Sequence, residues 1–244
     1  MGIGTEKRTP LAVLLAVMLT LVLASCDEGV DSMVLRLLRS EDEPVAYEDA
    51  SDSTIEELEA DVAAFRETVE AHSRAMRDLR RAHRALGMRY LEAGMYGAAL
   101  EQFEAAADIE PGNATIFYYA GIAAGNFAAG ALDDEERMAR LERAERAYLR
   151  ALELRPRYPS AAYGLAILYA YELDELSDAR NYIDKVLEWR TQDVRARAVS
   201  AHIYTAQGRI NEALGEYDRI IEEASDEEFR EQAMSMRRQL EEGQ

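Results

Sequence analysis

The sequence predicts an all-helical protein built from repeated pairs of helices, and three observations carry this prediction. Apolar and semi-apolar residues from Ile55 to Tyr90 follow one another at alternating spacings of three and four, the period of one helix face. No proline follows Ser53 until Pro111, so a long helix can run uninterrupted there. An alanine followed four residues later by a large side chain recurs along the rest of the chain, which indicates repeated helical units.

Composition places the chain among folded proteins and excludes some partners. Of its 244 residues, 48% are hydrophobic and 31% are charged, which is typical of a globular protein with a sizeable core. The formal net charge is −19. A body this acidic repels nucleic acid and anionic lipid headgroups at long range, so we expect neither as a partner.

The N-terminus resembles an export signal. Two basic residues precede an apolar run from Leu11 to Leu23, which is too short to span a bilayer comfortably. The tetrapeptide that follows, Leu23-Ala24-Ser25-Cys26, resembles the lipobox of bacterial lipoprotein signal peptides. The resemblance implies that residues 1–25 are a signal peptide. It also implies that Cys26, the only cysteine, carries diacylglycerol and becomes the new N-terminus.

From this we expect an exported protein that touches the membrane only through its lipid anchor. No later segment approaches the roughly 18 apolar residues of a transmembrane helix. The mature chain would therefore be held by acyl chains on a bacterial envelope membrane, inner or outer, and face the periplasm. Residues 26–52, rich in acidic clusters, are predicted to form a flexible tether.

A long helix is predicted next, over residues 53–79 and on into the first repeat as far as about Glu92. Ser53 and Glu56 have the spacing of a capping box at its start. Its apolar seam either pairs with another copy, as in a coiled coil, or packs on its own repeats. We expect the second arrangement and a monomer, because His72 on the seam disfavours a stable isolated coiled coil. The helix also carries an arginine stripe, suited to its own carboxylates, an acidic partner or a second copy: Arg74, Arg77, Arg80, Arg81 and Arg84.

Four repeats are predicted over residues 80–225. The recurring alanines are separated by steps of 45, 35 and 34 residues and lie at Ala99, Ala144, Ala179 and Ala213. Together with Leu86-Gly87-x-x-Tyr90, this pattern resembles the tetratricopeptide-repeat (TPR) family, whose period is 34. The resemblance implies a TPR helix-turn-helix solenoid. Thr191 and Ser225 depart from the family pattern, since they replace its terminal proline.

The second repeat and the C-terminus need separate explanations. The second repeat holds about eleven extra residues, and its Asp133–Glu136 run is expected to begin a lengthened second helix. A calcium loop is the alternative, but the required glycine and spacing are missing. Residues 226–244 are predicted to form a cap helix that turns Phe229, Met234 and Leu240 inward.

The sequence carries no signature of an active site. It has no nucleophile motif, phosphate loop or dinucleotide fingerprint, and none of its three histidines has a partner at metal-ligand spacing. We therefore predict no enzymatic activity, no cofactor and no metal.

The TPR resemblance does imply a binding surface. In that family the first helices of the repeats line a concave groove, and the corresponding side chains here are largely tyrosine and arginine. The carboxylate clamp of some TPR proteins is not matched, because Met88 stands where that clamp has an asparagine. The predicted groove residues are Arg81, Arg84, Met88, Tyr118, Ile122, Asn126, Tyr163, Ile167, Tyr171, Arg195 and His202.

Two functions compete on this basis. The first is a lipid-anchored scaffold of the cell envelope that binds a partner protein through the tyrosine-rich groove. The second is a periplasmic carrier or transport-system accessory that holds an apolar or aromatic small ligand in the same groove. The partner or ligand is not identified by the sequence.

Overall fold

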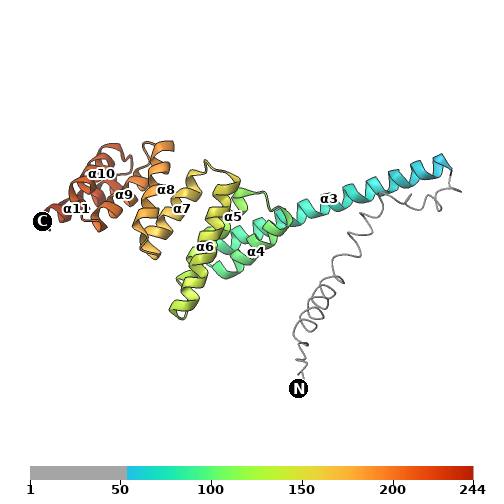
Figure 1. Ribbon diagram of the computed structural model, residues 1–244, viewed down its shortest axis with the longest axis horizontal. Helices are drawn as coiled ribbons and strands as arrows, with labels where there is room; N and C mark the ends of the chain where they lie inside the picture. Colours follow the sequence, from blue (N-terminus) through green and yellow to red (C-terminus); the bar gives the residue numbers. More distant parts are fainter. Residues whose placement is uncertain (1–53, 244) are drawn as a thin grey trace, which may run out of the picture. The chain divides into compact units, whose positions relative to one another are not determined.

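A computed structural model describes residues 54–243, which fall into two units, 54–69 and 70–243. Both are helical, and Figure 1 shows the helices in chain order. The predictions for residues 1–25, for Cys26 and for the tether lie outside the described residues. The elements are α3 (Ile55–Glu92), α4 (Tyr96–Ile109), α5 (Ala114–Ala128), α6 (Asp134–Leu154), α7 (Pro159–Ile167), the π-helix η2 (Leu168–Glu172), α8 (Leu176–Trp189), α9 (Val194–Ala206), α10 (Ile210–Glu223) and α11 (Glu227–Glu242).

The long helix predicted near Ser53 is α3, which has 38 residues. Its capping box lies one residue later than expected. The Thr54 backbone N–H donates to Glu57 Oε2 (2.8 Å), and the Glu57 backbone N–H donates to Thr54 Oγ1 (3.2 Å). Threonine and glutamate satisfy two otherwise unpaired amides at the helix start as well as serine and glutamate would. The sequence contains both Ser53-x-x-Glu56 and Thr54-x-x-Glu57, so it offers two capping boxes that differ by one residue.

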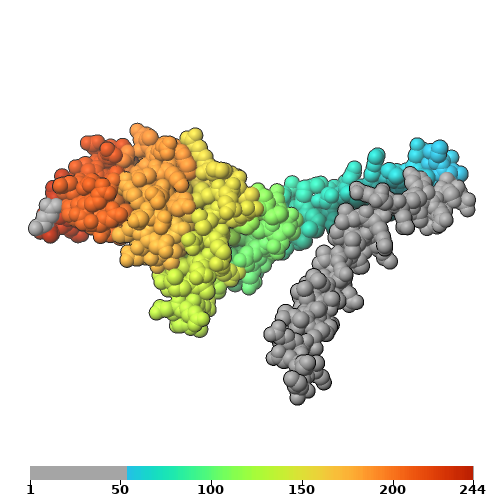
Figure 2. Space-filling view, in the orientation of Figure 1, coloured from blue at the N-terminus to red at the C-terminus, as the bar shows by residue number. Residues whose placement is uncertain are grey.

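Within residues 70–243 the helices form antiparallel pairs stacked in a row, as the TPR resemblance predicted (Figure 1). The helix α5 pairs with α6, α7 and η2 pair with α8, and α9 pairs with α10. The C-terminal part of α3 pairs with α4, where the Phe103 ring lies against Gly87. The helix α11 packs against α10 as a cap. Figure 2 shows that α4 to α11 present one continuous surface, from which the end of α6 projects. The fold is thus an all-α TPR solenoid of four repeats.

The recurring alanines hold the pairs together. Ala99, Ala144, Ala179 and Ala213 are fully buried, and so are the alanine, valine or isoleucine residues seven positions later. Small side chains at these points let the backbones approach, and the large residue between them fills the space left by its neighbours.

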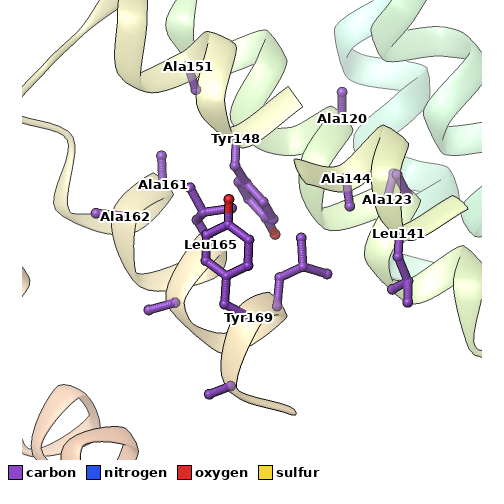
Figure 3. Packing of buried hydrophobic residues seen from close by; sticks show 14 of the residues in the cluster. Ala120, Ala123, Leu141, Ala144, Tyr148, Ala151, Ala161, Ala162, Leu165 and Tyr169 are labelled. Atoms are coloured by element: carbon purple, nitrogen blue, oxygen red, sulfur yellow. The ribbon is translucent and has the colours of Figure 1, made fainter. Parts of the chain in front are cut away.

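Tyr148 shows this packing most clearly. Its ring lies against the backbones of Gly121 on α5 and Gly164 on α7, where an added Cβ would lie only 2.7 and 2.8 Å from ring carbons. Figure 3 shows the Tyr148 side chain pointing from α6 into the cluster that includes Leu165. One aromatic ring therefore joins the second repeat to the third, and both glycines are required for its close approach.

The lengthened helix of the second repeat is confirmed. The helix α6 has 21 residues, whereas α4, α8 and α10 have 14 each. Asp133 caps it by accepting a hydrogen bond from the Glu136 backbone N–H (2.8 Å). Acidic residues in its first turn complement the positive end of the helix. The acidic run is thus part of a helix start.

The cap helix is also present, with one correction. Phe229 and Leu240 pack against the C-terminal apolar cluster as predicted, but Met234 is exposed and Ala233 is buried instead. Ala233 lies four residues after Phe229 and seven before Leu240, so the three share one face of the helix. Met234 is turned about 100° away from that face.

The apolar seam of α3 differs most from expectation. We expected the repeats to cover it, but the large apolar side chains of its first part are exposed by 40 to 78%: Ile55, Leu58, Val62, Phe65 and Val69. The C-terminal part of α3 does contact α4, since Arg80 pairs with Glu110 (2.6 Å) and His83 Nδ1 lies 2.8 Å from Gln102 Oε1. Because α4 has 14 residues and α3 has 38, α4 cannot pack along the whole length of α3.

Candidate partner-binding face

Tyr118, on α5, is the centre of an aromatic cluster. Its ring centroid lies 5.1 Å from that of Tyr119, 5.3 Å from Tyr158 and 6.3 Å from Tyr148. Tilted aromatic pairs at these distances contribute about 0.5–1.5 kcal/mol beyond the burial of their area. Tyr148 is buried, whereas Tyr118 is half-buried and keeps part of its ring available at the surface.

Two arginines near the start of the fourth repeat act on this cluster. Burial raises the pKa of Tyr118, nearby phenols add to the rise, and the positive charges of Arg195 and Arg190 oppose it. Burial likewise raises the pKa of Tyr163 on α7, and Arg195 again opposes the rise. Arg195 therefore lies close enough to act on the tyrosines of both α5 and α7. All these phenols stay protonated near neutral pH, so each can donate and accept a hydrogen bond.

A second aromatic contact continues the cluster along the repeats. Tyr171 stacks on His202 of α9, with ring centroids 4.2 Å apart and planes inclined by 17°. Tyr171 lies in η2, where the Leu173 N–H donates to the Leu168 carbonyl five residues earlier. A π-helical segment widens the turn and changes the direction of the side chains that follow. Nothing in the sequence predicted this segment, which carries Tyr171.

The remaining predicted residues lie on the first helices of their repeats but make other contacts. Met88, Ile122 and Ile167 are partly buried against the core. Asn126 donates its side-chain amide to the Ile122 carbonyl of its own helix (2.8 Å). Arg81 forms an exposed ion pair with Asp78 at 3.6 Å, and Arg84 is half-buried on α3.

Sequence reasoning missed Tyr158, Arg155 and Arg190. The Arg155 guanidinium lies 4.5 Å from the ring centroid of Tyr158, which itself contacts Tyr118. Arg190 and Arg195 line a pocket of about 510 Å³ at the turn between α8 and α9. Arg155 and Arg190 are the C-cap residues of α6 and α8, 35 positions apart. Because the repeats are about 35 residues apart, either arginine identifies the other as its equivalent in the neighbouring repeat.

These contacts define what we call the aromatic face. It combines aromatic area, neutral hydroxyl groups and cations, the side chains that most often anchor a protein partner. Arg195 is exposed, whereas Arg190 lies 3.8 Å from Asp193. Within residues 54–243, no group of three His, Cys, Asp or Glu side chains could hold a metal ion. The aromatic face comprises Tyr118, Tyr158, Tyr163, Tyr171 and His202, with Arg155, Arg190 and Arg195.

Comparisons with known proteins agree with this architecture. A tetratricopeptide-repeat family model matches residues 170–235. A TPR repeat-containing protein of Borreliella burgdorferi is 25% identical over 146 residues, which cover 60% of this chain and 64% of that relative. The match therefore spans less than two thirds of the relative's own length.

Solved structures show the same fold. A thermophilic TPR protein of Thermus thermophilus is 25% identical with a TM-score of 0.57, covering 64% of this chain and 80% of that one. A MamA fragment from Desulfovibrio magneticus is 18% identical with a TM-score of 0.54, covering 68% and 97%. The protein is therefore a helical repeat protein. More particularly, its helix pairs form a tetratricopeptide-repeat solenoid, the fold that these structures share.

No helix within residues 54–243 combines the length and the apolar character needed to cross a membrane.

Proposed function

We propose that this protein is a lipid-anchored scaffold of the bacterial cell envelope that binds a partner protein through the aromatic face. The observation that carries the proposal is the position of Arg195, whose charge acts on both Tyr118 and Tyr163. The three residues come from three successive repeats. Stacked repeats use such surfaces, shared between several helices, to hold extended or helical segments of other proteins.

The aromatic side chains support a protein partner. Half-buried tyrosines supply a large contact area and lose little conformational entropy on binding, because a tyrosine has only two side-chain torsions. Tyr118 and Tyr171 are already held by their aromatic neighbours at 5.1 and 4.2 Å, so both rings are fixed before a partner arrives. Preorganisation of this kind lowers the entropic cost of association.

The charges favour a partner segment that carries carboxylates. The protein has a net charge of −19, yet Arg155, Arg190 and Arg195 gather at this face. Guanidinium groups bind carboxylates through two parallel hydrogen bonds, and they stack on aromatic rings. An extended segment with aromatic or aliphatic and acidic side chains fits this combination.

The geometry gives less support to a carrier of small apolar ligands. Such ligands are held in pockets with mainly apolar walls. The pocket that includes Arg190 and Arg195 is lined mostly by polar residues of a turn between two helices, residues 189–195. A protein partner, which covers a surface, suits this face better.

The test is the loss of a partner from a variant that keeps its fold. Tagged protein is recovered from native membranes, and the proteins bound to it are quantified. Changing Tyr118 and Tyr163 together to Ala should weaken binding of the partner by about 2–4 kcal/mol, as expected for truncated anchors. Tyr182→Ala is the control, since this half-buried tyrosine lies on α8, the second helix of its repeat.

The two variants separate the possible interfaces. A protein retained by Tyr182→Ala and lost from the double variant is the partner of the aromatic face. Equal recovery by both variants and the wild type would refute the aromatic face and move the interface to the arginine stripe of α3 or to the second helices.

Membrane anchoring through Cys26 is tested separately. Cys26→Ala removes the only thiol that diacylglycerol could modify. We expect this variant in the soluble periplasmic fraction or as an uncleaved precursor, without incorporated palmitate. Membrane-bound, palmitate-labelled Cys26→Ala protein would contradict a lipid anchor at this residue.

A further inference from the structure

The first part of α3 presents an apolar stripe that nothing in the proposed function uses. Its side chains lie at positions 55, 58, 62, 65 and 69, and their spacing of three and four residues keeps them on one face. Phe65 is 70% exposed and Ile55 is 78% exposed. Removing large apolar side chains from water is favourable, so a second helix laid along the stripe would be stabilised by their burial.

The stripe continues as a heptad pattern into the next turns of the same helix. Ile55, Val62, Val69 and Met76 recur every seven residues, and a second series lies three residues after each of them. The second series consists of Leu58, Phe65, His72 and Leu79. These are the a and d positions of a coiled coil, the arrangement in which each side chain fits between four of a facing helix.

The distribution of charge along α3 favours a second copy of α3, in the opposite direction, as the facing helix. The first two turns of α3 carry Glu56, Glu57, Glu59 and Asp61, whereas the arginine stripe lies between Arg74 and Arg84. Two copies of α3 side by side in the same direction would put acidic turns against acidic turns. Two copies in opposite directions put the acidic end of each against the basic end of the other, which is attractive.

The antiparallel arrangement also aligns the apolar side chains. In an antiparallel coiled coil, a positions of one helix face d positions of the other. With Phe65 of one copy opposite Val69 of the second, Val62 faces His72, Leu58 faces Met76 and Ile55 faces Leu79. Every apolar position from 55 to 79 then has a partner. The polar His72 within the seam would fix this register at some loss of stability.

We propose that α3 binds α3 of a second copy of this protein, antiparallel, through residues 55–79. The arrangement has twofold symmetry, so each copy offers the same surface and the assembly closes as a dimer. Residues 55–79 include none of the residues of the aromatic face, so the two surfaces share no side chain. This proposal does not depend on the lipid anchor or on the partner.

Disulfide cross-linking of the full chain tests both pairing and direction. Two differently tagged copies are produced in the same cells, one with Val62→Cys and the other with His72→Cys, and intact cells are treated with copper phenanthroline. A disulfide requires Cα atoms within about 7 Å, whereas ten residues of helix span about 15 Å. The antiparallel dimer therefore cross-links the mixed pair and neither variant with itself.

Two controls accompany the mixed pair. Ala60→Cys with Arg74→Cys has the same register on the outer face of the helix, so it should not cross-link. The wild-type chain reports any disulfide formed by Cys26 alone. Phe65→Ser in both copies should abolish the cross-link without unfolding the protein, because Phe65 is exposed in the single chain.

The outcomes decide the proposal. A mixed-pair product the size of two chains, lost on Phe65→Ser, supports the antiparallel dimer. A product from Val62→Cys alone would show a parallel pair and overturn the proposal. So would a product with a different protein, or the absence of any product from stably produced variants.

Discussion

The first part of α3 and helix α5 are both regular helices, but they place their apolar side chains in opposite environments. In α5, Ile116, Ala120 and Ala124 are almost completely buried between the helices on either side. In residues 54–69 of α3, all five large apolar side chains are exposed. Helical periodicity is present in both, so periodicity alone does not say whether a face is covered within the chain.

The difference lies in the residues that border the apolar positions. Helix α5 contains two glycines and five alanines, which let α4 and α6 approach its backbone closely. The seam positions of residues 54–69 hold large apolar side chains, and acidic residues flank them in the first two turns. A small-residue helix buries itself among neighbours in the same chain, whereas a large-residue seam bordered by charge suits a helix from another copy.

The largest expected effect on stability comes from substituting one phenylalanine in each region. Phe103, on α4, is 1% exposed, and Phe65 is 70% exposed. Phe103→Ala should lower the free energy of unfolding by about 3–5 kcal/mol, because it leaves a cavity in the core. Phe65→Ala should change it by no more than about 0.5 kcal/mol in the monomer.

Urea unfolding followed by circular dichroism measures both variants, at a concentration too low for self-association. A large loss of stability from Phe65→Ala under these conditions would mean that the chain itself covers the seam, and the contrast between the two regions would fail.

A smaller effect on stability is expected when either of two glycines on α5 is replaced by alanine. An alanine Cβ at position 121 would lie 2.7 Å from ring carbons of Tyr148, but at position 125 its nearest neighbour is Ala144 Cβ at 3.9 Å. Gly121→Ala should therefore destabilise by about 1–3 kcal/mol through overpacking. Gly125→Ala should stabilise by about 0.5–1 kcal/mol, because alanine favours a helix interior.

Thermal unfolding of the two variants gives the comparison directly, since they differ only in position along one helix. Equal effects of the same sign would show that helix propensity, rather than the approach of Tyr148, governs both positions.

The smallest effect concerns alkaline pH. Burial raises the pKa of Tyr148 above its ordinary value of 10.0, and that of Tyr118, Tyr163 and Tyr217 rises for the same reason. The folded state then holds these protons more tightly than the unfolded state. Stability should therefore be constant up to about pH 10 and fall above it, with the buried Tyr148 contributing at most about 1.4 kcal/mol per pH unit and the half-exposed phenols much less.

Chemical unfolding at pH 9 to 11 measures this slope, and Tyr148→Phe should reduce it by removing one ionisable group. Residues 54–69 contain no tyrosine, so this part of the chain adds no phenol to the response. An unchanged slope in Tyr148→Phe would mean that other groups control alkaline unfolding.

Much of the candidate site follows from repeat register, and the part that does not depends on contacts between repeats. Tyr118, Tyr163 and Arg195 were predicted because each holds an inward position on the first helix of its repeat. The stacking of Tyr171 on His202 depends on η2, and a π-helical turn has no distinct sequence pattern. Asn126, predicted for the same surface, is exposed and donates a hydrogen bond to the Ile122 carbonyl of its own helix, a contact that the sequence did not predict.

The sequence by itself determined the helices, their pairing and the repeat number. Spacings of three and four residues specify a helix face, and Ala99 and its equivalents specify where two helices meet. Only the tertiary structure decided which faces are covered. The seam from Ile55 to Val69 and the core face of α5 have the same period, but the seam is exposed whereas α4 and α6 bury the core face of α5. Burial depends on which neighbour is within reach, and that is a property of the assembled fold.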